Sequence, residues 1–111
     1  MRYLILLWGD AEGEAALSPD ERRAIVEEHM AFGAQLRERG ALLDGDAVEP
    51  AAKTVRGGLV TDGPFAETKE QLGGFYMLDC DTIDDALEWA KQVPRSPGLV
   101  VEVRQLSGMS G

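Results

Sequence analysis

The chain has 111 residues, of which 20 are Asp or Glu and 11 are Lys or Arg, so its formal net charge is −9. A chain of this length has room for one hydrophobic core, and we expect a single domain over residues 1–111. The negative charge argues against nucleic acid and against anionic membrane surfaces as partners, because both repel a protein of the same sign.

The first part of the chain predicts a strand followed by a long helix. Residues 3–8 are apolar at every position, which is typical of a central strand covered on both faces. Residues 18–21 (Ser-Pro-Asp-Glu) form a capping-box helix start, and Gly40 suits the left-handed position after a helix end. The apolar face of this helix is formed by residues spaced four, three and four apart, namely Ile25, His29, Phe32 and Leu36.

The middle of the chain predicts a short strand and a hairpin. Residues 41–43 are typical of a short strand, and residues 44–50 carry turn and edge signals. Residues 54–56 and 59–61 flank Gly57-Gly58, as in a tight hairpin. Residues 62–64 (Asp-Gly-Pro) then end the hairpin.

The last part predicts a loop, a strand, a helix and a final strand. Residues 65–74 are expected to form a loop, where a site can lie, and residues 75–78 a strand. A second capped amphipathic helix is expected to begin at Thr82 and end near Pro94. Alternating apolar residues over 99–104 predict a half-buried strand.

This order of elements predicts an α+β fold with a ferredoxin-like antiparallel sheet and two helices on one face. The first strand is apolar on both faces, so the face without helices also needs a cover. A second copy of the chain is the simplest cover, and we expect a homodimer.

His29 is the strongest candidate for chemistry, because imidazole titrates near neutral pH and can act as a general acid or base. The alternative is a histidine at the edge of the core that donates to a backbone carbonyl. Asp62 is a candidate partner for His29, since an Asp-Gly-Pro turn can hold a carboxylate at the end of a sheet; alternatively, Asp62 only caps that turn.

Further polar and aromatic residues follow Asp62 and form a candidate ligand-binding set. The alternative for the charged residues is a solvated surface, and an aromatic residue in a strand commonly belongs to the core. The candidate ligand-binding residues are Phe65, Glu67, Thr68, Lys69 and Tyr76.

No cofactor or metal is predicted from the sequence. The chain has one histidine and one cysteine, Cys80, too few for a soft-metal site, and it has no dinucleotide-binding or P-loop motif. The acidic residues between 79 and 85 lack the glycine and the distal glutamate of a calcium loop. A lone cysteine also excludes an intrachain disulfide, so we expect a cytoplasmic protein.

The segment Asp-Gly-Pro-Phe-Ala-Glu-Thr-Lys-Glu at residues 62–70, followed by Leu72-Gly73-Gly74-Phe75, resembles the DGPF-domain branch of the YCII-related family. The resemblance extends over nearly the whole chain, from the first strand to Val103. It implies a subunit that pairs into a dimeric α+β barrel, with a pocket between the sheet and its helices. It also implies a regulatory partner, because DGPF proteins resemble domains encoded beside, or fused to, extracytoplasmic-function sigma factors.

YCII-related proteins carry a helix histidine followed at a fixed interval by a Leu-Leu pair, and here His29 and Leu42-Leu43 match that spacing. The family also places an aspartate directly before a proline after the second helix, as partner to the histidine. This chain instead has Val93 before Pro94. A carboxylate from residues 62–70 as its substitute is a hypothesis of our own.

The sequence therefore leads to three functional hypotheses. In the first, the pocket binds a small organic molecule, and His29 and Asp62 serve acid/base chemistry of the isomerase, lyase or hydrolase type. In the second, the chain is a non-catalytic module that senses a ligand or interacts with an extracytoplasmic-function sigma factor. In the third, the motif at residues 62–70 only shapes a loop and the dimer surface.

Overall fold

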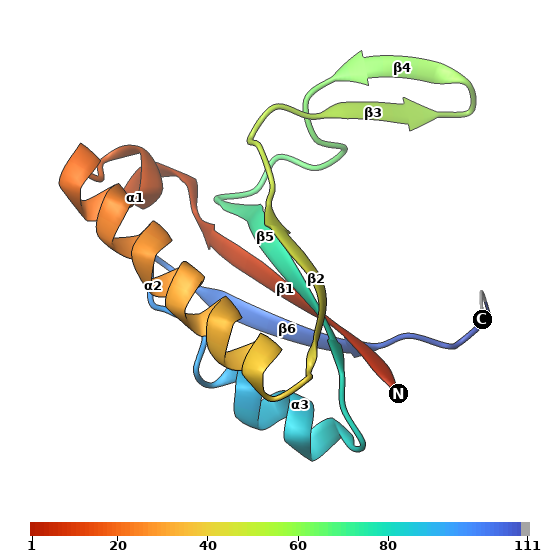
Figure 1. Cartoon of the computed structure of the whole chain (residues 1–111). Coiled ribbons are helices and arrows are strands. Elements are labelled where there is room, and N and C mark those ends of the chain that lie inside the picture. Colours follow the sequence, from red (N-terminus) through yellow and green to blue (C-terminus); the bar gives the residue numbers. More distant parts are fainter. Residues whose placement is uncertain (110–111) are drawn as a thin grey trace.

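The computed structural model describes residues 1–109 (Figure 1). Its strands are β1 (Arg2–Asp10), β2 (Leu42–Ala47), β3 (Lys53–Arg56), β4 (Leu59–Asp62), β5 (Glu70–Asp79) and β6 (Val100–Gln105). Its helices are α1 (Ala11–Ala15), α2 (Pro19–Glu38) and α3 (Ile83–Ala90). None of the helices in this part of the chain is long and apolar enough to cross a membrane.

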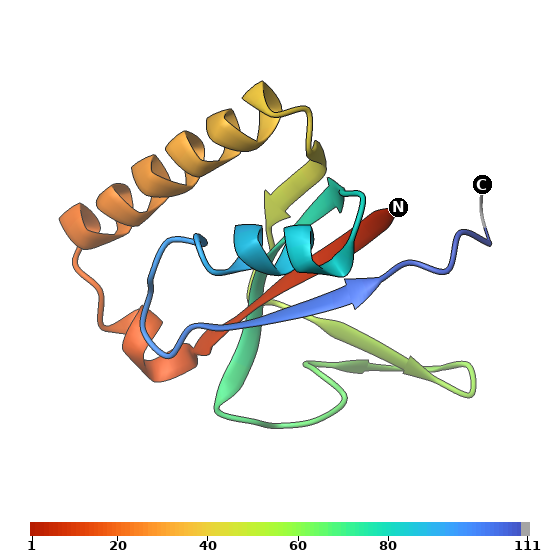
Figure 2. The ribbon, with the colours of Figure 1, turned by 90° about the horizontal axis from the view of Figure 1, so that it is seen from below.

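Four strands form an antiparallel sheet in the order β2-β5-β1-β6. The long helix α2 and the shorter α3 lie on the same face of this sheet (Figure 2). This arrangement confirms the predicted α+β, ferredoxin-like fold.

The start of α2 is built as the sequence predicts. The Ser18 side chain accepts a hydrogen bond from the Glu21 amide, and the Glu21 carboxylate accepts one from the Ser18 amide. Beyond the helix end, Gly40 has a φ of +69°, and the amide of Ala41 donates to the carbonyl of Leu36. The chain therefore turns sharply from α2 into β2.

The core lies between the sheet and its helices. Alternate residues of β1 point into it, and they pack against Phe32 and Leu36 of α2 and Ala86 of α3. The buried residues of β1 are Tyr3, Ile5 and Leu7, with Gly9. Because the intervening residues of β1 are only half-buried, this strand is fully covered on one face alone within the subunit.

The uncovered face of the sheet, which we call the open face, is largely apolar. Strand register places Leu4 beside Met77, and Leu6 beside Phe75. Trp8 pairs with Leu72 on one side and with Val100 on the other. The apolar residues form a strip along β1 and β5 that Val100 extends onto β6, while Arg104 and Glu102 of β6 lie beside Leu4 and Leu6.

Two predicted boundaries and one element were wrong. Residues 44–46, expected in a turn, lie inside β2, and β5 begins at Glu70 instead of residue 75. Ladder pairing between β2 and β5, such as that of Ala47 with Gly74, outweighs the turn preference of Asp and Gly. Helix α1 was not predicted; its amide at Gly13 donates to the Asp10 side chain, which caps it.

Strands β3 and β4 form the predicted hairpin. The turn residues Gly57 and Gly58 have φ values of +56° and +82°, a left-handed pair that suits a two-residue hairpin turn. The hairpin projects from the side of the sheet opposite the helices (Figure 2). It is therefore separated by the sheet from anything that lies under α2.

Candidate functional site

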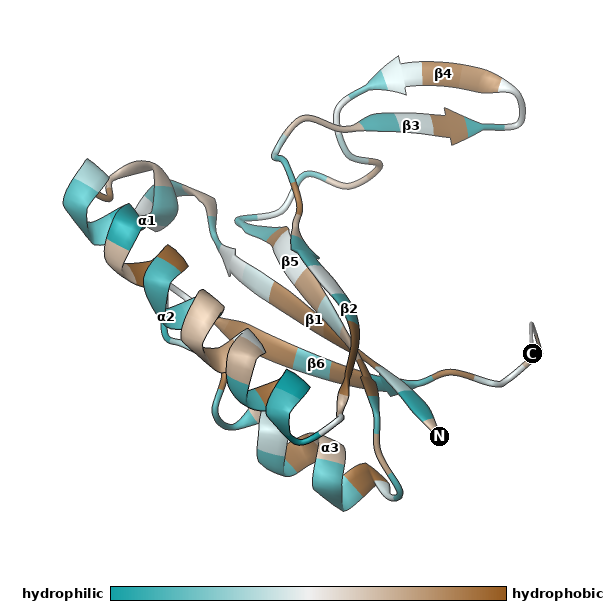
Figure 3. Cartoon of the chain, in the orientation of Figure 1, coloured by the Kyte–Doolittle hydropathy of each residue, from teal (hydrophilic) through white to brown (hydrophobic). Residues whose placement is uncertain are grey.

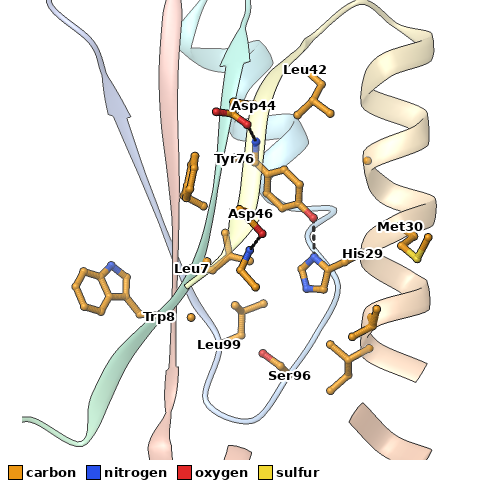
Figure 4. A pocket seen from close by; sticks show the side chains of 18 of the residues that line it. Leu7, Trp8, His29, Met30, Leu42, Asp44, Asp46, Tyr76, Ser96 and Leu99 are labelled. Atoms are coloured by element: carbon orange, nitrogen blue, oxygen red, sulfur yellow. Dashed lines mark hydrogen bonds between the residues drawn. The ribbon is translucent and has the colours of Figure 1, made fainter. Parts of the chain in front are cut away.

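A pocket of about 910 Å³ lies between α2 and the sheet (Figure 4). Helix α2 forms one wall, and strands β2 and β5 form the other. Ser96 and Leu99, from the segment just before β6, also line the pocket (Figure 4). A pocket of this volume is large enough for a small organic molecule.

The central polar feature of the pocket is a contact between His29 of α2 and Tyr76 of β5. The Nδ1 atom of His29 lies 2.7 Å from the hydroxyl oxygen of Tyr76. Their rings are nearly parallel, with centroids 6.0 Å apart and an interplanar angle of 18°. A hydrogen bond therefore joins the imidazole and the phenol, and either group can be its donor.

Packing fixes the phenol ring of Tyr76 in this position. The edge of Phe32 meets it at a centroid distance of 5.2 Å. On β2, Gly45 lies opposite Tyr76 in the strand register, and a Cβ atom at Gly45 would lie only 2.8 Å from the ring carbon Cδ1. The missing side chain of Gly45 thus makes room for the ring that holds the hydroxyl against His29.

Partial burial keeps both groups of this pair neutral near pH 7. Desolvation lowers the pKa of His29 below its usual 6.5, against an opposing effect of the Glu28 charge. Desolvation also raises the pKa of Tyr76 above 10.0, so the phenol keeps its proton. A neutral imidazole can accept a proton, and a protonated phenol can donate one.

We expect an NMR titration of the single imidazole to give a pKa below 6.5. The pKa of His29 is then lower in the folded chain than in the unfolded chain, where it is about 6.5. Between these two values the unfolded chain binds more protons, so the free energy of unfolding falls as the pH drops below about 6.5. His29→Gln abolishes this slope. Asp62→Asn is the matched control and leaves the pKa unchanged, and a wild-type pKa at or above 6.5 would contradict the burial argument.

Charged residues lie at the ends of the pocket. Arg22 and Arg37 line it from the same helix as His29, seven residues before and eight after, which places them about 10 and 12 Å along the helix axis. Glu14 of α1 also lines it, and its carboxylate accepts a hydrogen bond of 3.1 Å from the Gln71 amide. Sequence reasoning missed these three residues, although the spacing of the arginines from His29 is a helix-face signal.

Within one subunit, the structure does not bring Asp62, the partner suggested by the sequence, to His29. Asp62 lies at the end of β4 and forms an ion pair with Lys53 of the neighbouring strand β3. It does not line the pocket, whereas Tyr76 does. The hairpin leaves the sheet on the side away from α2, and this direction cannot be read from an Asp-Gly-Pro turn.

The remaining candidates from the motif lie outside the pocket in the subunit. Phe65 is 79% exposed, and Glu67 and Lys69 are exposed in the segment before β5. The Thr68 hydroxyl donates to the carbonyl of Glu70 at 2.6 Å. A ligand-binding role for these four residues stays a prediction.

Two further positions from the family resemblance have clear places in the structure. Leu42 and Leu43 both line the pocket beside His29. Val93 is buried in the core and is not part of the pocket wall. Because residue 93 is a valine, it offers His29 no carboxylate, and the hydrogen bond of the imidazole is made with the Tyr76 hydroxyl instead.

The family model for the YCII-related domain matches residues 1–109 of this chain. The chain belongs to the YCII-related family. A relative in this family, an uncharacterized protein from Rhizobium meliloti (strain 1021), is 37% identical over 99 residues, which span 84% of this chain and 80% of that protein. Within residues 1–109 of this YCII-related chain, no group of three or more His, Cys, Asp or Glu residues is arranged to hold a metal ion.

Proposed function

We propose that this YCII-related protein binds a small organic molecule in the pocket under α2 and that His29 transfers a proton on it. The observation that carries the proposal is the 2.7 Å contact between His29 and Tyr76 in the wall of a pocket of about 910 Å³. Pairs of titratable groups in a partly buried pocket are typical of proton-transfer sites.

The His29–Tyr76 pair can either donate a proton to the ligand or accept one from it. When the phenol donates to Nδ1, the imidazole carries its proton on Nε2 and can donate it to the ligand while the phenol proton moves to Nδ1, which leaves Tyr76 as a phenolate. When Nδ1–H donates to the phenol oxygen, Nε2 has a free lone pair and can remove a proton. Proton transfer of this kind supports isomerase or lyase chemistry with no reactant besides the ligand, and hydrolase chemistry with water as the second reactant.

Gly33 offers a direct test of the pocket, because it lines the cavity in the middle of α2 and a Cβ atom there would meet nothing within 4 Å. We expect Gly33→Leu to fill the pocket and to abolish binding of small molecules that bind the wild type. The fold should be kept, since leucine favours a helix over glycine by about 0.5–1 kcal/mol.

The measurement is a ligand-observed NMR screen of a small-molecule library against both proteins. Ala34→Leu is the matched control, because it adds the same side chain on the exposed side of the same helix. Hits that bind wild type and Ala34→Leu but not Gly33→Leu support the proposal. Hits that bind all three proteins equally place the binding elsewhere and contradict it.

We also propose that the protein is a homodimer in which a second copy covers the open face. The support is the apolar surface formed by Leu4, Leu6, Phe75 and Met77, which a monomer would leave only half-buried in water. Sedimentation equilibrium measures this directly, and a monomer at micromolar concentration would contradict it.

A non-catalytic role is the second candidate function, in which the pocket senses a ligand and the chain interacts with an extracytoplasmic-function sigma factor. The buried Val93 favours it, because His29 then has no carboxylate partner to stabilise an imidazolium. Binding of a purified sigma factor that changes when a pocket ligand is added, without turnover of that ligand, is the result expected of such a sensor.

A further inference from the structure

The hairpin of residues 53–62, which we call the arm, exposes an unusual amount of apolar side chain. Val55 is 67% exposed, Val60 is 66% exposed and Leu59 is 74% exposed. Figure 3 shows hydrophobic segments on both of its strands. A monomeric protein seldom presents such a cluster to water, and a projecting one indicates a contact surface.

The arm has little support from its own subunit. Its strands make extensive contacts only with each other, as in the register pair of Val55 with Val60. The Lys53–Asp62 ion pair and a 2.7 Å hydrogen bond from the Thr54 hydroxyl to the Gly63 carbonyl close its base. Because an isolated two-stranded hairpin is only marginally stable in water, an ordered arm needs a surface to pack against.

The direction of the arm indicates which surface this is. The arm projects on the side of the sheet opposite α2 and α3, which is the side of the open face (Figures 1 and 2). The arm leaves the sheet at the end where Trp8 and Phe75 lie, so a partner that covers this end of the open face would lie beside the arm as well. The exposed valines and the open face then form two parts of one apolar contact.

The charges of the arm and of the whole chain favour a second copy of this chain as the partner that covers the open face and the arm. The arm carries two cations, Lys53 and Arg56, and one anion, Asp62, whereas the chain as a whole carries a net charge of −9. Two acidic subunits repel each other, and a cationic arm laid on the partner offsets part of that repulsion. Because Lys53 pairs with Asp62 inside the arm, Arg56 is the cation that remains for this contact, and a neutral or basic partner would gain nothing from it.

We propose that the arm of each subunit embraces the partner subunit, with Val55 and Val60 packed against it. The inference rests on the proposed homodimer and goes beyond it, because it assigns part of the interface to a segment outside the sheet. By twofold symmetry each subunit both gives and receives one arm.

The test is sedimentation equilibrium of the intact chain and of the double variant Val55→Ser/Val60→Ser. We expect the dimer dissociation constant to rise by about tenfold or more, because eight methyl groups, four from each arm, leave the interface. Met109→Ser is the control, since Met109 is exposed in the chain's final segment and its loss should leave the constant unchanged. Far-ultraviolet circular dichroism verifies that each variant keeps its fold.

Hydrogen exchange on the wild type gives a second readout that needs no substitution. The amides of residues 53–62 should lose protection when the protein is diluted below its dissociation constant, while those of β1 keep it. If the wild type is a dimer but the double variant has the same dissociation constant and the arm amides are unprotected, the contact of the arm with the partner is disproved and the dimer is not. A wild-type monomer at every concentration would overturn the dimer and the arm together.

Discussion

Turnover of a substrate found for this pocket is expected to fall by about 10²–10⁴-fold when His29 is replaced by glutamine. Glutamine can still hydrogen-bond to the Tyr76 hydroxyl, but its amide does not take up or release a proton near neutral pH. The loss should appear in kcat, with KM little changed, because the side chain keeps its place in the pocket wall.

The pH profile separates this role from a structural one. Wild-type turnover that uses the imidazole as a base should fall as the pH drops through the lowered pKa of His29, and this acid limb should vanish in His29→Gln. Tyr76→Phe is the companion variant, because it keeps the ring against Phe32 and Gly45 and removes only the hydroxyl. An unchanged kcat in His29→Gln would end the catalytic assignment.

Leu36→Ala is expected to reduce the free energy of unfolding by about 2–5 kcal/mol. Leu36 is fully buried, and it belongs to the stripe of α2 that faces the sheet. Its truncation leaves a cavity at the C-terminal end of the helix, where the Leu36 carbonyl also accepts the hydrogen bond from Ala41 that leads into β2. The loss therefore affects the packing of α2 on the sheet and the pocket beneath it.

Urea unfolding at a fixed protein concentration measures this effect, because dimerisation would otherwise add its own concentration dependence. The midpoint should fall while the slope stays the same. Met30→Ala on the same helix is the control, since Met30 is 69% exposed and its loss should cost less than about 0.5 kcal/mol. A loss below about 1 kcal/mol for Leu36→Ala would show that α2 contributes little to the core.

Elements that are determined by interactions between residues close in sequence could be predicted from the sequence. The capping box at Ser18 and the glycine pair at 57–58 each gave the correct element. The placement of His29 on the apolar face of α2 also followed from spacing alone. In each of these cases the deciding interactions lie within a few residues of one another along the chain.

The site could be predicted only in part, because its deciding contact is long-range. His29 and Tyr76 are 47 residues apart, and their meeting depends on the register of β2 and β5 and on the space that Gly45 leaves. The position of Asp62, away from His29 within one subunit, could not be predicted for a related reason. Its neighbours in sequence are well defined, but the side of the sheet to which the hairpin turns is set by the whole fold.

The arm is inserted between two strands, β2 and β5, that pair with each other directly. β2 and β5 are hydrogen-bonded neighbours, with Ala47 paired to Gly74 and the Val48 amide donating to Gly73, so the chain leaves the ladder and returns to the same place. No strand of the four-stranded sheet depends on the intervening residues for its pairing. The pairing of the four-stranded sheet therefore sets no limit on the length of the segment between these strands.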